Sequence, residues 1–405
     1  TSKAAQKTLR NFANIFLTQY PKLIIWQGRC NGASAAQPLP MPLARADPQN
    51  PRKQADDDTK PKALLEQAGR DMAGAVSVRL CSLGIELGLF KDLHAHGRST
   101  SAQLAARLHL NERYVREWLH GIVLSGYVMF DKTTREAWLS PDQAQLLVED
   151  SGRFAQYGAF KLLNSALLPY EKLREAFKSG GGVGFEDYPP ALWQALDHTG
   201  CARYRNFLVK DWLPHIPALT QRLKKGARFA DFGCGTGRST IELAKLFPES
   251  EFIGYDAFLP NIEQAGVNAK EAGVDRNITF KHWNMDEGSP GQYDIIATFD
   301  LIHDLPNPAL GLKTLKHSMA QDGMFLLMDI EATEDPVDNS GPYGVFKLGI
   351  SLHFCMTTSM WQGGEGMGTV GLSDSVLRNL CTEAGFSEVQ KINIKHPLNS
   401  LYLIT

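Results

Sequence analysis

The sequence predicts an α/β protein in which a seven-stranded, mostly parallel sheet follows a mainly helical N-terminal domain. Residues 227–258 supply the first observation: one apolar run ends at Asp231, a helix-compatible segment follows, and a second apolar run ends at Asp256. The second observation is that short apolar runs and helical segments keep alternating to the C-terminus, the pattern of parallel strands joined by crossover helices. The third is that residues 61–150 carry apolar residues at helical spacing instead.

Length and composition narrow the class of protein. With 405 residues, 43% hydrophobic and 21% charged, the chain can bury a full core, and we expect two or three domains. A net charge of −2 favours neither nucleic acid nor an anionic membrane as partner, and the lack of a long apolar run argues against a membrane-spanning helix. The six cysteines stand singly without a CxxC motif, which indicates reduced thiols in an intracellular compartment. His94 and His96 lack further ligands nearby, so no metal site is expected.

Residues 1–60 are interpreted as a basic leader outside the folded domains. Residues 1–53 contain eight Lys or Arg and one acidic residue, Asp47. This composition resembles an organelle transit peptide, with a disordered cytosolic tail as the alternative. We therefore expect a mitochondrial or plastid protein if residues 1–53 are a transit peptide, and a cytoplasmic protein otherwise.

Residues 61–150 are predicted to form a winged-helix domain. A Ser/Thr cap, a helix, a short turn and a second helix precede two strand-like runs around residues 131–134. The second helix could lie in a DNA major groove, but it mixes Arg113 and Arg116 with acidic and apolar residues. A role in dimerisation and as a substrate lid is therefore favoured over DNA binding.

A helical connector, residues 151–226, is predicted to lead into the sheet domain, residues 227–405. Its glycine run at 178–190 is expected to form a flexible loop over the ligand site. Seven strands are expected near residues 228–232, 252–256, 278–281, 293–298, 324–330, 386–394 and 400–404. No helix separates the last two, which predicts a final antiparallel hairpin.

The turn after the first strand has the composition of a nucleoside-binding cradle. Gly233, Gly235 and Gly237 tolerate positive φ and let a ligand approach the backbone, while the following helix offers free N–H groups. Asp256 lies 19 positions after Gly237, where a carboxylate can accept both ribose hydroxyls. Asp231, just ahead of the glycines, would repel a pyrophosphate and suits a cationic ligand.

The glycine spacing also separates the classes of nucleotide-binding protein. A dinucleotide dehydrogenase would need glycine at position 238, which is Arg238, and the Gly-Lys-Ser/Thr of a P-loop is absent. A cationic ligand that contains adenosine predicts S-adenosylmethionine (SAM), which carries a sulfonium and an ammonium group. An ordinary strand–turn–helix with turn glycines is the alternative.

Polar residues after the later strands are further candidates, because sites in such sheets lie at the strand C-termini. Asn284 or Asp286 could meet the adenine amino group while Met285 packs on the ring. Asp300, at the end of the fourth strand, is a further expected cofactor contact.

His303 and Asp329 are expected to meet at neighbouring strand ends. An imidazole whose other nitrogen bonds a carboxylate is fixed in one tautomer and made more basic, which suits a general base for an O–H or S–H acceptor. A packed structural histidine is one alternative; with a neutral thioether acceptor, His303 would only position the substrate. The long aromatic-rich insertion before the sixth strand adds Tyr343 and His353 as expected substrate contacts.

The phrases WLPHIPAL, DFGCGTGRST, FDLIHDLPNP and HFCMTTSMWQGGEGMGT resemble class I SAM-dependent methyltransferases of the small-molecule O-methyltransferase plan, over roughly residues 65–405. The resemblance implies a Rossmann-like methyltransferase sheet, an N-terminal winged-helix dimerisation domain and a homodimer. It implies that His303 is the catalytic base and that Asp329 supports it, although plant members have Glu there. The plant enzymes' second supporting Glu aligns near Gly371 and is absent, and their Asp-Met adenine contact falls on Asn284-Met285.

Relatives of this plan methylate phenols, hydroxyindoles and, in some marine organisms, the sulfur of methylthio-hydroxy acids. The resemblance therefore predicts SAM-dependent methyl transfer to an O or S atom of a small-molecule acceptor, with a thioether acid as one alternative acceptor. A non-catalytic SAM-sensing or DNA-binding winged-helix regulator is the alternative from another class.

Overall fold

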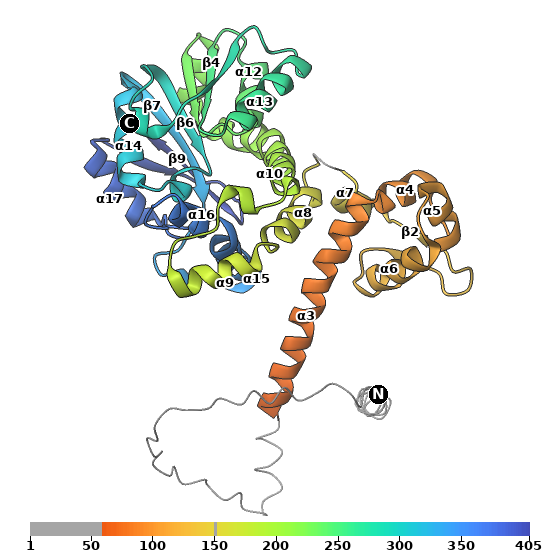
Figure 1. The fold of residues 1–405 in the computed structure, drawn as a ribbon. Helices are drawn as coiled ribbons and strands as arrows, with labels where there is room; N and C mark the ends of the chain where they lie inside the picture. Colours follow the sequence, from red (N-terminus) through yellow and green to blue (C-terminus); the bar gives the residue numbers. More distant parts are fainter. Residues whose placement is uncertain (1–58, 150–151) are drawn as a thin grey trace, which may run out of the picture. The chain divides into compact units, whose positions relative to one another are not determined.

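The computed structural model describes residues 59–149 and 152–405 of the chain (Figure 1). It divides into two units, residues 1–63 and residues 64–405, and the second contains both the helical domain and the sheet. Residues 1–58 of the predicted leader lie outside the described residues, residues 59–60 begin the first described helix, and the finer division at residues 61, 151 and 227 stays a prediction.

The predicted winged-helix region has the expected order of helix, turn, helix and two strands. The first helices described are α3 (Thr59–Glu86), α4 (Leu89–His96), α5 (Ser101–Leu108), α6 (Glu112–Leu124) and α7 (Pro141–Leu147). Thr100 caps α5 by accepting a hydrogen bond from Gln103 N, and Trp118 and Leu119 of α6 are buried, as their apolar spacing indicates. The strands β1 (Met129–Phe130) and β2 (Ala137–Trp138) pair antiparallel and form the wing.

Helical segments connect this domain to the sheet. They are α8 (Tyr157–Ala166), α9 (Tyr170–Ser179), η1 (Phe185–Asp187), α10 (Pro190–Arg203), η2 (Tyr204–Trp212), η3 (Leu213–His215) and α11 (Pro217–Lys224). The segment η2 is a π-helix that directly continues α10, and such segments often occur at functional sites. Helices α8 and α10 pack with α15 (Gly341–Ile350) and η7 (Ser351–Cys355) in a separate apolar cluster.

The seven predicted strands are confirmed. They are β3 (Arg228–Phe232), β4 (Glu251–Asp256), β5 (Ile278–His282), β6 (Tyr293–Phe299), β7 (Met319–Ile330), β8 (Val389–Ile392) and β9 (Asn399–Ile404). Their order in the sheet is β5-β4-β3-β6-β7-β9-β8. The first five run parallel, whereas β9 is antiparallel to both β7 and β8, so the final hairpin is also confirmed.

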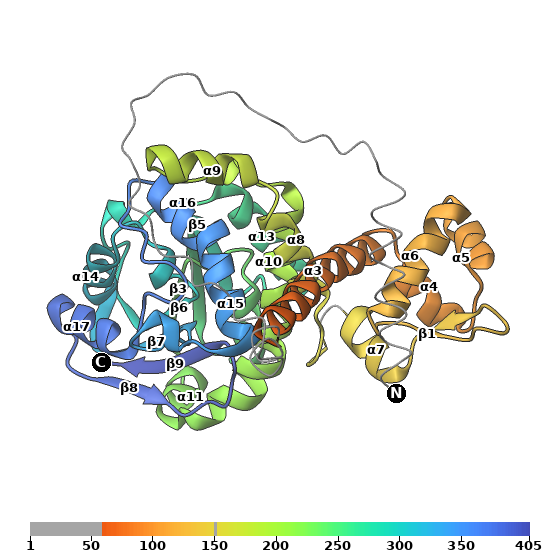
Figure 2. The ribbon, with the colours of Figure 1, turned by 90° about the horizontal axis from the view of Figure 1, so that it is seen from below.

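Helices cover both faces of this sheet, because its strands are apolar on both sides (Figure 2). Along β6, Ile295 packs into the core formed with η2, η3, α11, α12 (Arg238–Leu246) and α13 (Leu259–Glu271). The next residue, Ile296, packs into the opposite core with α14 (Pro308–Ser318) and α17 (Asp374–Ala384). Two short helical turns follow strands: η4 (Met285–Glu287) follows β5 and η5 (Ile302–Asp304) follows β6.

The insertion between β7 and α17 is mainly helical. It contains η6 (Pro336–Asp338), α15 (Gly341–Ile350), the π-helical η7 (Ser351–Cys355) and α16 (Met356–Trp361). Within the described part of the chain, no helix alone is long and apolar enough to cross a membrane; one bent pair, Lys60–Glu86 with Leu89–His96, meets the length and composition criteria only together.

Candidate active site at the carboxyl edge of the sheet

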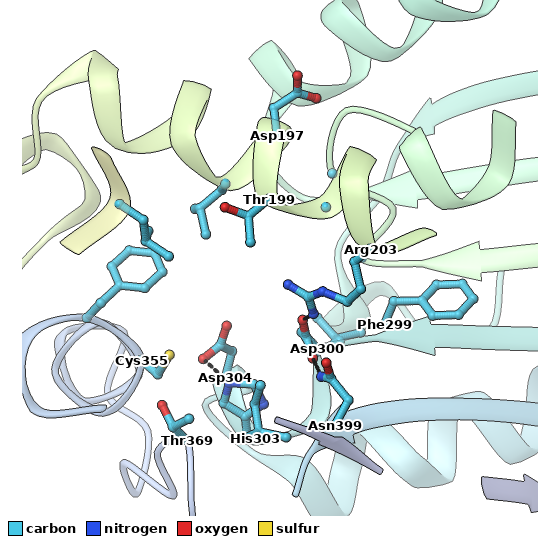
Figure 3. Close-up of a pocket in the computed structure, with 18 of the residues that line it drawn as sticks. Asp197, Thr199, Arg203, Phe299, Asp300, His303, Asp304, Cys355, Thr369 and Asn399 are labelled. Carbon is cyan, nitrogen blue, oxygen red and sulfur yellow. Dashed lines mark hydrogen bonds and ion pairs between the residues drawn. The ribbon is translucent and has the colours of Figure 1, made fainter. Parts of the chain in front are cut away.

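A large cavity opens where β3, β4 and β6 end. Its volume is about 1410 Å³, and its walls come from these strand ends together with α8, α10, η2 and the insertion (Figure 3). Predicted site residues that line it are Gly233, Gly235, Asp256, Asn284, Met285, Asp300, His303 and Tyr343. Most of the residues expected to bind the cofactor, and the expected catalytic histidine, therefore line the same cavity.

The glycine turn after β3 is shaped for a ligand at one position. Gly233, Gly235 and Gly237 all have positive φ, at 73°, 55° and 78°. A Cβ at Gly233 would lie 2.7 Å from Leu301, and one at Gly237 would lie 2.4 Å from Phe280, so a side chain at either position would displace its neighbour. A Cβ at Gly235 would meet nothing within 4 Å, so this backbone faces open space in the cavity.

Asp256 ends β4 and closes the same turn. Its Oδ2 accepts a hydrogen bond from Gly235 N at 2.8 Å, and its Oδ1 accepts from Phe258 N at 2.9 Å and from Asn261 Nδ2 at 3.2 Å. Burial raises the pKa of this carboxyl, against the effect of these donors. The carboxylate is thus held rigidly at the cavity wall.

Asp231 corrects part of the prediction, because it does not line the cavity. It is fully buried, and its Oδ2 accepts hydrogen bonds from Ser239 Oγ at 2.6 Å and Thr240 Oγ1 at 2.7 Å. The sequence places it correctly at the end of β3, but the two hydroxyls of the first turn of α12 hold the carboxylate beneath the glycines. Its contribution is to tie the glycine turn to α12.

The substitution Asp231→Asn should reduce the loss of stability at high pH. Burial raises the pKa of Asp231 in the folded protein to about 7 from 3.8. Protonated Asp231 therefore contributes to the free energy of unfolding, fully at pH values below its pKa in the unfolded chain, and this contribution is lost as the pH rises through about 7. Between about pH 5 and pH 8 this difference corresponds to roughly 3 kcal/mol. Urea unfolding of the wild type and the variant at the two pH values measures this difference in the free energy of unfolding. The pKa of Asp256 is also raised, but Asp256 is present in both proteins. Equal pH dependence of the two proteins would contradict the raised pKa of Asp231.

The expected adenine contacts lie on the short turn after β5. Asn284 caps η4, where its Oδ1 accepts from Asp286 N at 3.3 Å, and it lines the cavity together with Met285 and Asp286. Met285 also packs against the apolar core beneath α14. The thioether of Met285 is therefore anchored beside the cavity.

Asp300 is held by partners far away in the sequence. Its backbone has a left-handed φ of 54°. Its carboxylate accepts hydrogen bonds from Nη1 of Arg203 and, at 3.2 Å, from Nδ2 of Asn399 (Figure 3). Arg203 ends α10 and Asn399 begins β9, so no local pattern indicated either residue. This network joins the connector, β6 and β9 at the cavity.

His303 and Asp329 meet as predicted from their strand ends. His303 Nδ1 lies 2.5 Å from Asp329 Oδ1, and both residues are almost fully buried. His303 Nε2 faces Asp304, 3.2 Å from its Oδ1. Burial lowers the pKa of His303, but Asp304 and Asp329 outweigh this and raise it well above its ordinary value. The imidazole therefore has a fixed orientation and a high proton affinity at the cavity wall.

The two expected substrate contacts differ in placement. Tyr343, on α15, is about half exposed and lines the cavity. His353, on η7, is not among the residues that line it; its Nδ1 pairs with Gly349 O at 2.9 Å, and its backbone carbonyl accepts from Tyr188 Oη. The π-helical turn η7 directs Phe354 and Cys355 into the cavity in its place.

Sequence reasoning also missed a clamp on the glycine turn. Asp197 of α10 accepts hydrogen bonds from Arg238 Nε at 2.7 Å and Arg238 Nη2 at 2.8 Å, and a further one from the Thr236 hydroxyl. Arg238 occupies the place at which a dinucleotide-binding turn has its third glycine. The side chain that excludes that motif thus fixes α10 over the cavity.

The fold and the cavity together define a methyltransferase domain of the class I SAM fold that follows a winged helix-turn-helix domain in the chain, as the sequence predicts. Family models agree: an Rv2258c-like winged HTH domain matches residues 74–149, and a methyltransferase domain matches residues 223–348.

Similarity in sequence covers only part of the chain, whereas similarity in structure covers most of it. An uncharacterised methyltransferase of Emericella nidulans, AN0656, is 39% identical over 116 residues, which are 26% of this chain and 35% of the relative. The structure of human N-acetylserotonin methyltransferase in complex with SAM aligns with a TM-score of 0.62 at 17% identity, over 89% of this chain and 99% of that chain. An O-methyltransferase family protein of Burkholderia thailandensis aligns with a TM-score of 0.63 at 14% identity, over 84% and 97%.

The solved structures are below 20% identical to this chain, so their similarity shows the fold alone. Alignments to three curated relatives span only 24%, 53% and 35% of their lengths.

Proposed function

We propose that this protein is a SAM-dependent methyltransferase that acts on an O or S atom of a small-molecule acceptor. The observation that carries the proposal is the combination, in one cavity, of an open glycine position beside a fixed carboxylate and a buried His–Asp pair. The first pair suits an adenosine ligand and the second suits proton transfer from an acceptor.

The residues present fit SAM. Gly235 leaves space for close backbone approach, Asp256 can accept the ribose hydroxyls, and Asn284 and Met285 can contact the adenine. Asp300 lines the same wall with its carboxylate paired to Arg203, and it is the residue we assign to the cationic methionine end. Bound SAM would supply a methyl group on a positively charged sulfonium.

The chain's own residues would position and deprotonate the acceptor. In-line alignment of two reactants can contribute on the order of 7–11 kcal/mol. Asp329 fixes Nδ1 of His303 and raises the proton affinity of the imidazole, and Nε2 would take the proton from an acceptor hydroxyl or thiol. Tyr343 and the aromatic rings of the connector and insertion would exclude water around an organic acceptor.

A thioether acceptor is the second candidate for the same cavity. A neutral thioether has no proton to lose, so His303 would then only position it. The helix α6 supports an enzyme over a DNA-binding regulator, because its arginines are paired: Arg113 with Glu117 at 2.5 Å and Arg116 with Glu112 at 3.6 Å.

Isotope transfer tests the proposed function. Purified protein is incubated with methyl-labelled SAM and a metabolite extract, supplemented with phenols, thiols and thioether acids, and products are identified by mass spectrometry. We expect a labelled acceptor that is absent when the protein is omitted. No labelled product, together with no uptake of SAM, would contradict the proposal.

We also propose that the protein is a homodimer joined through α3. Among the exposed large apolar residues of this helix are Leu65, Met72, Val76 and Leu83, with exposed fractions of 70%, 65%, 58% and 44%. Spacings of seven, four and seven residues place them on one side of the helix. A second copy of the chain would bury this stripe.

Introducing charge into this stripe should separate the subunits. The double change Met72→Glu and Val76→Glu should convert a dimer into single chains of 44.8 kDa in size-exclusion chromatography with light scattering. Gln67→Glu, on the opposite side of α3, is the matched control and should stay dimeric. A monomeric wild-type protein, or a double variant that remains a dimer, would contradict this interface.

A further inference from the structure

Three different metal-ligand types converge beside the proposed acceptor position. They are His303 and Asp304 of η5 and Cys355 of η7, and one donor atom from each lies within 4.8 Å of the other two. Figure 3 shows the three side chains grouped on one side of the cavity, with Thr369 next to them. The insertion thus delivers a thiol to the imidazole and carboxylate that follow β6.

The charge and hydrogen bonding of this group are incomplete. Two carboxylates, Asp304 and Asp329, face a single imidazole. Asp304 Oδ1 and Asp329 Oδ2 are buried and accept no hydrogen bond, although the first lies 3.2 Å from His303 Nε2. The hydroxyl of Thr369, 4% exposed, interacts with the Cys355 thiol. Buried polar atoms are normally satisfied, so the two unpaired carboxylate oxygens leave a place for a positively charged ligand beside the imidazole.

The imidazole is oriented as in metal sites. Ligating histidines donate their second ring N–H to a carboxylate, which fixes the tautomer and raises ligand basicity. Asp329 supplies this contact at Nδ1, and Nε2 is directed toward Asp304 and Cys355.

We propose that His303 Nε2, Asp304 and Cys355 Sγ bind one zinc ion. A set of one nitrogen, one oxygen and one sulfur ligand suits Zn²⁺ and disfavours Mg²⁺ and Ca²⁺, which prefer oxygen ligands alone. Three protein ligands leave the fourth tetrahedral position open, as in catalytic zinc sites. All three residues line the cavity, so the open position would face the acceptor.

The inference rests on the proposed function for its consequence but not for its test. Zinc would occupy the Nε2 lone pair, so a zinc-loaded molecule cannot use His303 as a base. An acceptor hydroxyl or thiol at the open position would instead lose its proton to solvent more readily, because coordination lowers its pKa. Zinc-free and zinc-loaded protein would therefore activate the acceptor in different ways.

Direct metal binding tests the site. The full chain is stripped with a chelator, equilibrated with Zn²⁺, desalted and analysed for metal; Co²⁺ loading reports a thiolate ligand by its charge-transfer absorption. We expect one zinc per wild-type chain, at least tenfold weaker binding in Cys355→Ser and in Asp304→Asn, and loss of the thiolate absorption in Cys355→Ser. Asp329→Asn should weaken binding roughly 10- to 100-fold without removing that absorption.

A matched cysteine variant and a SAM titration separate the possible failures. Cys201→Ser, on α10 and outside the cluster, should bind zinc like the wild type. Substoichiometric zinc in the wild type, or unchanged affinity in both Cys355→Ser and Asp304→Asn, overturns the site while leaving SAM binding and the proposed function intact. Circular dichroism and retained SAM binding show that a variant is folded.

Discussion

Replacing His303 with alanine should lower turnover of an O–H or S–H acceptor at least about 100-fold while leaving SAM affinity almost unchanged. A general base contributes roughly 10²- to 10⁴-fold in rate. His303 is almost fully buried at the cavity wall and oriented by Asp329 at 2.5 Å, whereas the glycine turn and Asp256 do not depend on it. Turnover under saturating SAM, with calorimetric SAM titration of the same preparations, measures both effects.

The control for this prediction is another histidine of the same region. His353→Ala removes a ring that pairs with a carbonyl of its own helix and does not line the cavity, so it should keep most of the activity. A loss below about threefold in His303→Ala would reject the general-base role and favour a thioether acceptor. Equal losses in both variants would indicate a general disturbance of the insertion.

Asp256→Ala should weaken SAM binding at least about 100-fold. Two hydrogen bonds from ribose hydroxyls to a carboxylate are worth roughly 1.5–3 kcal/mol each, and the substitution also frees the Gly235 N–H that Asp256 now holds at 2.8 Å. Asp256→Asn keeps an oxygen for that N–H but lacks the charge, so it should give an intermediate loss.

A carboxylate at the opposite end of the strands is the control for this second prediction. Asp294 accepts from Arg228 N at 2.9 Å near the start of β3 and β6, away from the cavity. Asp294→Asn should therefore leave SAM affinity unchanged, as measured by calorimetry. Unchanged affinity in Asp256→Ala would contradict the ribose assignment.

The strands of the sheet could be predicted from the sequence because each one is marked by a pattern of neighbouring residues. Each strand is a short apolar run bounded by turns, and β8 and β9 follow each other without a helix, so both strand positions and the final hairpin could be inferred. The sequence also predicts that residues after the strands gather at one edge, because sites in such sheets lie at the carboxyl ends, and the residues after β3, β4 and β6 do lie together.

Parts of the site could not be predicted because they depend on contacts between distant segments. Arg203 reaches Asp300 across 97 positions, and Asp197 reaches Arg238 across 41, with no periodic signal at either end. The π-helical turn η7 decided which residue of the insertion enters the cavity, turning Cys355 inward where His353 was expected.

Asp231 shows a different limit of sequence reasoning. Its position at the end of β3 was correct, but a carboxylate there can face a ligand or turn beneath the glycines. Ser239 and Thr240 in the first turn of α12 decide this, because their hydroxyls offer two hydrogen bonds in the buried direction. The two hydroxyls directly after Arg238 were the signal that could have indicated it.

Calorimetric titration of the purified full chain with SAM tests the central claim most directly. The account predicts one equivalent bound per chain, strong weakening by Asp256→Ala, and no binding of a nicotinamide dinucleotide, because Arg238 fills the place of its third glycine. Absence of SAM binding, or SAM binding that Asp256→Ala leaves unchanged, would contradict it.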